Sequence, residues 1–238
     1  MYAHVSPLLK VDPVTANKRK LSKRHDPEAD IQYFFRQGIP TDAILEFLTN
    51  IVDPFFEERQ KNNLDKSYKD YEFDISRMNQ AGALLDMTKL AFVSKEWLAR
   101  LPKDEFAQMA LEWVEKYGAE FEIENTELKL HDLMKKHPEY TFNVLNIERL
   151  TDADPKRYRM FSDVAIQLPA FYDEIWETML VSKPELPVPC DQARMSAFLA
   201  EYEALLELSM SKDAWFAQFK EIGAKHGFAA SNADFKTG

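Results

Sequence analysis

Apolar side chains recur at intervals of three and four residues over most of the chain from Ser94 onward, the pattern of α-helices with one buried face. The clearest case is PKDEFAQMALEWVEKYG at 102–118, which Gly118 should end. Its buried face is expected to carry Phe106, Met109, Ala110, Trp113, Val114 and Tyr117. The sequence therefore predicts an α-helical region over 94–238.

The first 93 residues predict a smaller, mixed region. YAHVSPLLKV near the N-terminus favours a short strand followed by a loop. Asp26 is then expected to cap a helix that Pro27 begins and Gly38 ends. The stretch TDAILEFLTNIV predicts a second helix directly afterwards. The fold class we expect is mainly α, with a small mixed α/β region at 1–93 followed by the helical region.

Two stretches indicate further boundaries inside the helical region. TDADPKRYR at 151–159 is typical of a hinge, and SKPELPVPC at 182–190 has three prolines in nine residues. The helical pattern between these stretches should break at Pro169, because proline removes a backbone donor. Sub-boundaries are therefore expected near both stretches.

The net charge is −10, yet residues 1–24 carry six basic side chains and one acidic one, a local charge of +5. An acidic body argues against a protein that coats nucleic acid non-specifically, so any nucleic acid should be bound through local basic patches. The single cysteine, Cys190, excludes an intrachain disulfide and a thiolate zinc site. It fits a reducing compartment, and no apolar run approaches the roughly 20 residues that span a bilayer. We expect a cytoplasmic protein with no membrane partner.

Basic charge is concentrated in KLSKR at 20–24, directly before the first expected helix. A lysine ammonium can follow a phosphate as negative charge builds on it, and a serine hydroxyl can donate to a phosphate oxygen. The candidate polyphosphate-binding loop is Lys20, Leu21, Ser22, Lys23 and Arg24. From charge alone, the alternative is a solvated basic loop without a ligand.

Two more segments are candidates for contact with RNA. RLTDADPKRYR at 149–159 interleaves basic side chains with an aromatic one, which suits single-stranded RNA because a base can stack on tyrosine. An ordinary interdomain linker is the alternative. HDLMKKH at 131–137 predicts either a solvated basic face or contact with an RNA backbone, and its histidine spacing does not suit a metal site. The RNA-binding candidates are Lys135, Lys136, Arg149, Lys156, Arg157, Tyr158 and Arg159.

KLSKR resembles KMSKS, the second signature motif of class I aminoacyl-tRNA synthetases, with Leu21 at the position where methionine is commoner. The motif continues as KLSKRHDPEADIQYFFRQG, and is followed by FDISRMNQAGALLDMTKL at 73–90 and NVLNIER at 143–149. With these stretches in this order, essentially the whole chain resembles the C-terminal half of a bacterial glutamyl-tRNA synthetase.

This resemblance implies that Lys23 is the catalytic lysine, which steadies the phosphates of ATP while the carboxylate of glutamate attacks the α-phosphate. The other residues of 20–24 would complete the ATP-phosphate loop. It also implies a region at 1–93 that contacts the tRNA stem and an anticodon-binding domain at 94–238. The partner would be glutamate tRNA, with glutamine tRNA left open, and not DNA. ATP with magnesium would act in the full-length enzyme.

The His-x-Gly-His type signature of class I synthetases is absent from the 238 residues. The resemblance therefore implies a fragment without the catalytic nucleotide-binding fold, with no cofactor or metal of its own and no activity alone. The alternative from another class is an acidic helical protein–protein interaction module without RNA binding. RNA binding that falls steeply with salt and depends on tRNA identity would separate the two.

Overall fold

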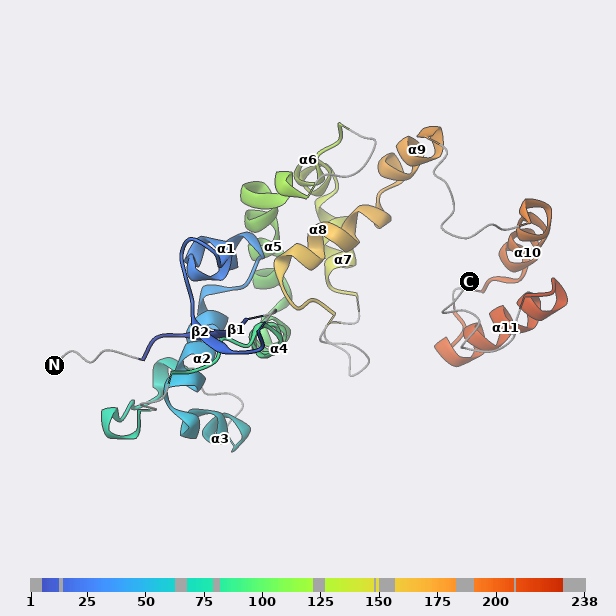
Figure 1. The fold of residues 1–238 in the computed structure, drawn as a ribbon. Helices are drawn as coiled ribbons and strands as arrows, with labels where there is room; N and C mark the ends of the chain where they lie inside the picture. Colours follow the sequence, from blue (N-terminus) through green and yellow to red (C-terminus); the bar gives the residue numbers. More distant parts are fainter. Residues whose placement is uncertain are drawn as a thin grey trace. The chain divides into compact units, whose positions relative to one another are not determined.

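The computed structural model describes residues 6–12, 15–62, 68–78, 82–121, 127–147, 149, 157–182, 191–207 and 209–228. The chain forms two compact units, Met1–Ser182 and Lys183–Gly238 (Figure 1). Helices dominate both units, and the sheet in the described part of the chain has two strands. The expected fold class, mainly α with a small mixed region, is confirmed.

The mixed region begins with a hairpin of β1 (Leu9–Val11) and β2 (Lys18–Lys20), which are antiparallel. Residues 83–85 lie beside β1, because the Leu9 amide donates to the Ala83 carbonyl and the Leu85 amide donates to the Leu9 carbonyl, both at 2.8 Å. A short 3₁₀ helix at Pro27–Ala29 and helix α1 (Ile31–Arg36) follow the hairpin. The strand at the N-terminus and the helix after it were both expected.

A first core lies between the helices that follow α1. These helices are α2 (Thr41–Val52), α3 (Pro54–Asn62) and α4 (Met87–Arg100), with 3₁₀ turns at Tyr68–Asp70 and Ile75–Arg77. Helices α2 and α4 pack against each other along much of their length. The buried apolar residues of this core are Phe34, Ile39, Ala43, Ile44, Phe47, Leu85, Leu90 and Val93.

A second, larger core is built by the helices from α5 to α9. They are α5 (Lys103–Tyr117), α6 (Leu130–Lys136), α7 (Pro138–Leu145), α8 (Phe161–Gln167) and α9 (Asp173–Ser182), with 3₁₀ turns at Gly118–Glu120 and Leu168–Phe171. The expected helix over 102–118 is confirmed, and so is the expected break at Pro169. The buried face of α5 carries Phe106, Ala110, Trp113 and Val114.

Helix α4 belongs to both cores. Val93 lies in the first core, Leu98 lies in the second, and Trp97 packs against both. The expected boundary between residues 93 and 94 therefore lies inside α4. The functional division at that point stays a prediction.

Two hydrogen bonds also join α1 to the second core. The Trp113 indole nitrogen donates to the Phe35 carbonyl at 2.8 Å, and the Phe161 amide donates to the Gly38 carbonyl at 2.9 Å. Gly38 has a φ of +78°, the left-handed conformation that ends a helix and that glycine adopts most easily. The expected helix stop at Gly38 is confirmed, and the same residue docks α1 on the start of α8.

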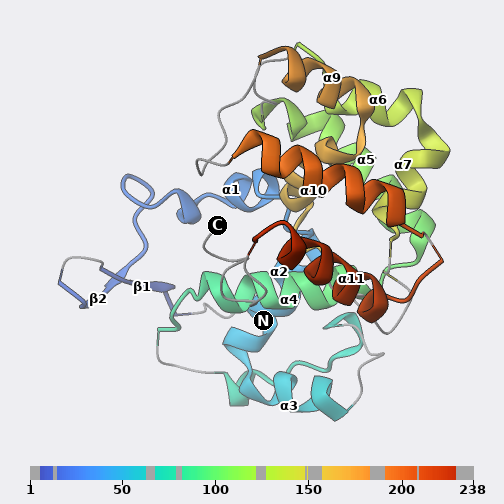
Figure 2. The same cartoon turned by 90° about the vertical axis from the view of Figure 1, so that its right-hand side faces the viewer.

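The second unit is a pair of helices, α10 (Gln192–Leu205) and α11 (Lys212–Lys225), which lie side by side in Figure 2. Aromatic rings of both helices meet between them, and the Trp215 indole donates to the Tyr202 hydroxyl at 2.7 Å. The Ser211 hydroxyl caps α11 by accepting from the Ala214 amide. Among the described residues of both units, none of the helices combines the length and apolar character needed to cross a membrane.

Candidate functional site

The candidate phosphate loop leaves the end of β2 and returns to the 3₁₀ helix at Pro27–Ala29. Its first residues are anchored, because the Leu21 amide donates to the Leu8 carbonyl at 3.1 Å and the Leu21 side chain packs against the first core. Leu21 therefore holds the start of the loop through an apolar contact. This contact explains why a large apolar residue suits this position between charged neighbours.

The loop closes on Asp26, which is 3% exposed. Its carboxylate accepts from the Arg19 guanidinium at 2.6 and 2.8 Å, and from the Ser22 amide at 2.8 Å. Lys10 lies 3.5 Å from the same carboxylate. The hydrogen bonds from Arg19 and Ser22 hold the pKa of the Asp26 carboxyl well below its usual range.

The expectation that Asp26 caps a helix is wrong. It stands at the start of the 3₁₀ helix, but its side chain accepts no capping hydrogen bond there, because Arg19 and the Ser22 amide occupy its oxygens. The cap of α1 is Asp30, which accepts from the Gln32 amide at 3.0 Å. The sequence therefore indicated correctly that an aspartate caps the helix, but that aspartate is Asp30, four residues after the predicted Asp26.

Three cations project from the loop. Lys20, Lys23 and Arg24 are exposed, and none of them has a side-chain hydrogen bond or ion pair within the described part of the chain. The Ser22 carbonyl accepts from the amides of His25 and Asp26, which folds residues 22–26 into a tight turn. A loop that carries three cations without side-chain partners offers donors and positive charge to an anion with several oxygens.

Two of the candidate RNA contacts need correction. Arg149 is 2% exposed, and its guanidinium donates to the carbonyls of Leu98 and Leu101, both at 3.1 Å. It lies over the Phe106 ring at 3.7 Å, and burial lowers its pKa to about 10. Tyr158 is 1% exposed and stacks on the same ring at 5.3 Å. Both side chains belong to the second core and cannot touch RNA from there.

The other described candidates lie at the surface or near it, each with a partner of its own. Lys135 pairs with Glu115 at 3.3 Å, and Lys136 pairs with Glu174 at 2.8 Å. The two arginines at 157 and 159 bond to the Gln167 amide oxygen and to the Asp163 carboxylate, respectively. Lys156 lies outside the described residues. Lys135 and Glu115 are both well exposed, so their pair is weak enough in water for a phosphate to replace the carboxylate.

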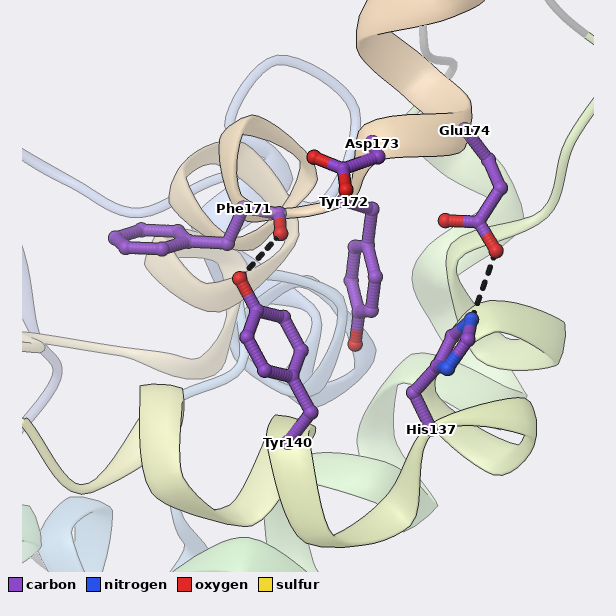
Figure 3. Close-up of a pocket in the computed structure, with 6 residues that line it drawn as sticks. All are labelled: His137, Tyr140, Phe171, Tyr172, Asp173 and Glu174. Carbon is purple, nitrogen blue, oxygen red and sulfur yellow. Dashed lines mark hydrogen bonds and ion pairs between the residues drawn. The ribbon is translucent and has the colours of Figure 1, made fainter.

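A pocket of about 290 Å³ lies between the start of α7 and the start of α9 (Figure 3). It is lined by His137, Tyr140, Phe171, Tyr172, Asp173 and Glu174. The Tyr140 hydroxyl donates to the Phe171 carbonyl at 2.6 Å, and the Tyr172 hydroxyl is 2.7 Å from that of Thr141. With these hydroxyls engaged and two carboxylates at its edge, the pocket does not suit a phosphate.

Glu174 at this pocket gives a testable pH dependence. Hydrogen bonds from Lys136 and His137 lower the pKa of its carboxyl from 4.5 to about 2. Because this folded-state pKa lies below the unfolded one, the contact stabilises the fold above about pH 4.5 and is lost as the pH falls through about 2. A carbon-13 NMR titration of the carboxyl should therefore show a midpoint near pH 2.

Lys136→Met should raise that midpoint, because the Lys136 hydrogen bond is the larger cause of the shift. Glu201 in the second unit is a control: its pKa is lowered by His226 and Lys225 and should not respond to this substitution. A Glu174 midpoint that stays the same in Lys136→Met would contradict the assigned cause.

Groups of three or more metal-ligating side chains are absent from the described part of the chain. Sequence reasoning missed the part that Arg19 and Lys10 play at the loop. The signal for it was a basic run flanked by Asp12 and Asp26, since charges of opposite sign at the two ends of a hairpin tend to pair.

Comparison with known proteins places these features in context. No protein-family model matches the chain. It is 28% identical over 235 residues to the glutamate–tRNA ligase of Clostridium perfringens, 32% identical over 247 residues to that of Sorangium cellulosum, and 29% identical over 236 residues to that of Acetivibrio thermocellus. Each match covers 99% of this chain and only 40% or 41% of the relative's length. Over nearly its whole length, the chain is therefore related to the C-terminal part of glutamate–tRNA ligases.

Proposed function

We propose that this chain serves in a glutamate–tRNA ligase, where its loop at 20–24 contacts the phosphates of ATP and its helices bind tRNA. The observation that carries the proposal is the group of three cations without side-chain partners on the loop at 20–24, whose sequence matches the synthetase motif. Similarity to glutamate–tRNA ligases over nearly the whole chain supports the same assignment.

Within this proposal, Lys23 stabilises negative charge on the phosphates as glutamate attacks the α-phosphate. An ammonium on a flexible stem can stay close to a phosphate oxygen while charge shifts from one oxygen to another. Lys20 and Arg24 add charge on either side, and the Ser22 hydroxyl would donate to a further oxygen.

For tRNA, the proposed contacts are Lys135, Lys136, Arg157 and Arg159. The two lysines pair with carboxylates, so binding there would exchange a carboxylate for an RNA phosphate and would weaken with salt. Glutamate tRNA is the proposed partner. Whether glutamine tRNA also binds would depend on which anticodon bases the helices read.

The chemistry of aminoacylation would need residues that this chain does not carry. A His-x-Gly-His type sequence is absent from the 238 residues, so we propose that the chain alone forms no glutamyl-tRNA. The purified chain, incubated with ATP, glutamate and tRNA, is expected to yield no product above background. Formation of glutamyl-tRNA would overturn this part of the proposal.

The experiment that tests tRNA binding measures affinity for a glutamate tRNA transcript and for one with a changed anticodon, at fixed near-physiological salt. The native anticodon should bind more tightly. Lys135→Ala combined with Lys136→Ala should weaken binding to both and reduce the salt slope by roughly 1.5, because about two phosphate contacts are lost.

Lys20→Ala combined with Lys23→Ala is the matched control, since it removes the same charge from the ATP loop. It should leave tRNA affinity nearly unchanged. Equal weakening by both double variants would indicate attraction to overall charge rather than a tRNA site. Equal affinity for both transcripts would remove anticodon reading from this chain.

A protein-binding module without RNA binding is the second candidate. The observation in its favour is the exposed apolar face at the end of α9, where Trp176, Leu180 and Val181 are all open to solvent. No binding to either transcript, even at low salt, would favour this candidate.

A further inference from the structure

The buried carboxylate of Asp26 lies directly beneath the loop at 20–24. We propose that Asp26, held by Arg19, is the positioning residue that fixes the shape of the 20–24 loop and the direction in which Lys23 leaves it. The proposal rests on the function proposed for this loop, because positioning matters only if the cations meet a ligand.

Two hydrogen bonds join Ser22 and Asp26. The Ser22 amide donates to the Asp26 carboxylate at 2.8 Å, and the Asp26 amide donates to the Ser22 carbonyl at 2.8 Å. Both ends of the turn are thus tied to the same pair of residues. Lys23, Arg24 and His25 form the tip between them, and a tip of three residues leaves the backbone little room to rearrange.

Arg19 holds the carboxylate in turn. It donates one nitrogen to each carboxylate oxygen, at 2.6 and 2.8 Å, which is the two-pronged geometry that fixes orientation as well as distance. Its third nitrogen donates to Asp12 at 3.3 Å. Because Arg19 lies in β2 and Asp12 follows β1, the hairpin itself sets where Asp26 stands.

Lys10, in strand β1, brings a second positive charge to the Asp26 carboxylate. It lies opposite Arg19 in the hairpin and contacts both Asp26 and Glu28. The positive charges of Arg19 and Lys10 are thus used within the protein. Within the loop at 20–24, the charge left for a ligand is that of Lys20, Lys23 and Arg24, although the sequence presents Arg19 as part of the same basic run.

This arrangement gives the cations a shape before any ligand arrives. A loop that is already ordered loses less conformational entropy on binding, so each contact contributes more to affinity. Asp26 makes this contribution without touching the ligand. Loss of the Asp26 carboxylate would therefore disturb the order of the turn directly and weaken phosphate binding only as a consequence.

The test uses the purified chain, nitrogen-15 labelled, with inorganic tripolyphosphate as the probe. In Asp26→Asn, which keeps the size but removes the charge and one acceptor, the Ser22 amide should exchange with solvent roughly 10-fold faster. The apparent affinity of tripolyphosphate, read from the amide shifts of Lys23 and Arg24, should fall several-fold. Amides in the cores should exchange as in the wild type.

Asp30→Asn is the matched control, because it removes the same charge four residues along and its side chain accepts from the Gln32 amide of α1 rather than from the loop. It should leave Ser22 exchange and tripolyphosphate binding unchanged. Arg19→Lys keeps the charge but loses the two-pronged contact, so it should give an intermediate loss and serves if Asp26→Asn folds poorly.

Unchanged Ser22 exchange in both Asp26→Asn and Arg19→Lys would overturn the proposal. So would faster exchange with undiminished tripolyphosphate affinity, since Asp26 would then shape the turn without affecting the ligand. If tripolyphosphate fails to shift Lys20, Lys23 and Arg24 even in the wild type, the phosphate function of the loop fails. That result concerns the function, and Ser22 exchange then still decides whether Asp26 shapes the turn.

Discussion

Arg149→Ala should lower the free energy of unfolding of the first unit by about 3 kcal/mol, within a range of roughly 2–4. Arg149 donates to the carbonyls of Leu98 and Leu101, at the end of α4, and its guanidinium covers the Phe106 ring. The substitution leaves buried carbonyl oxygens with fewer donors and opens a cavity over that ring. Part of the loss is offset because a buried positive charge is removed, as the lowered pKa of Arg149 indicates.

The measurement is urea unfolding followed by tryptophan fluorescence and circular dichroism. Arg149→Met keeps an unbranched side chain against Phe106, so its smaller loss isolates the cost of the missing hydrogen bonds. Arg36→Ala is the control at the surface, where its partner Glu120 is 3.7 Å away, and should cost less than about 1 kcal/mol. Similar losses in Arg149→Ala and Arg36→Ala would mean that Arg149 does not hold the core.

Gly38→Ala should destabilise the first unit by roughly 2–5 kcal/mol. A side chain at a φ of +78° is strained, and the added Cβ would lie 2.7 Å from both the Cβ and the amide nitrogen of Phe161. A backbone atom at that distance cannot rotate away. The joint between α1 and α8 must therefore open, which also lengthens the hydrogen bond from the Phe161 amide to the Gly38 carbonyl.

Gly227→Ala separates the two causes, because Gly227 has a φ of +74° but the added Cβ would lie 3.8 Å from its nearest neighbour, a nitrogen of Arg194. It should cost about 1 kcal/mol in its own unit, from backbone strain alone. Urea titration followed by two-dimensional NMR reports the units separately. If Gly38→Ala costs no more than Gly227→Ala, the close approach to Phe161 is unimportant.

Much of the fold could be predicted from the sequence because its signals are local. The spacing of apolar residues at 102–118 specified α5, and Gly38 specified the end of α1. The predictions that were wrong concern side chains whose hydrogen-bond partners are distant in sequence. Asp26 bonds to Arg19 across the hairpin rather than capping a helix, and Arg149 bonds to carbonyls 48 and 51 residues earlier in the chain.

The same difference between local signals and distant contacts applies to the candidate site. The loop at 20–24 could be identified from its motif and its charge, because the residues that carry both are consecutive in the sequence. The surface at 149–159 was inferred from composition, and composition does not tell which side of a segment faces the core. Arg149 and Tyr158 face inward around Phe106, whereas Arg159 faces solvent beside Asp163.

Because α4 contributes Val93 to one core and Leu98 to the other, the first unit has no natural cutting point near residue 94. A piece that starts there would lose half of a helix and the carbonyl of Phe35 that receives the Trp113 indole. Damage to the loop-bearing half should then spread to the helices proposed to hold tRNA, since the two cores share α4 and are expected to unfold together. Workers who wish to dissect this chain for binding or crystallisation should cut between Ser182 and Lys183, where the two compact units divide.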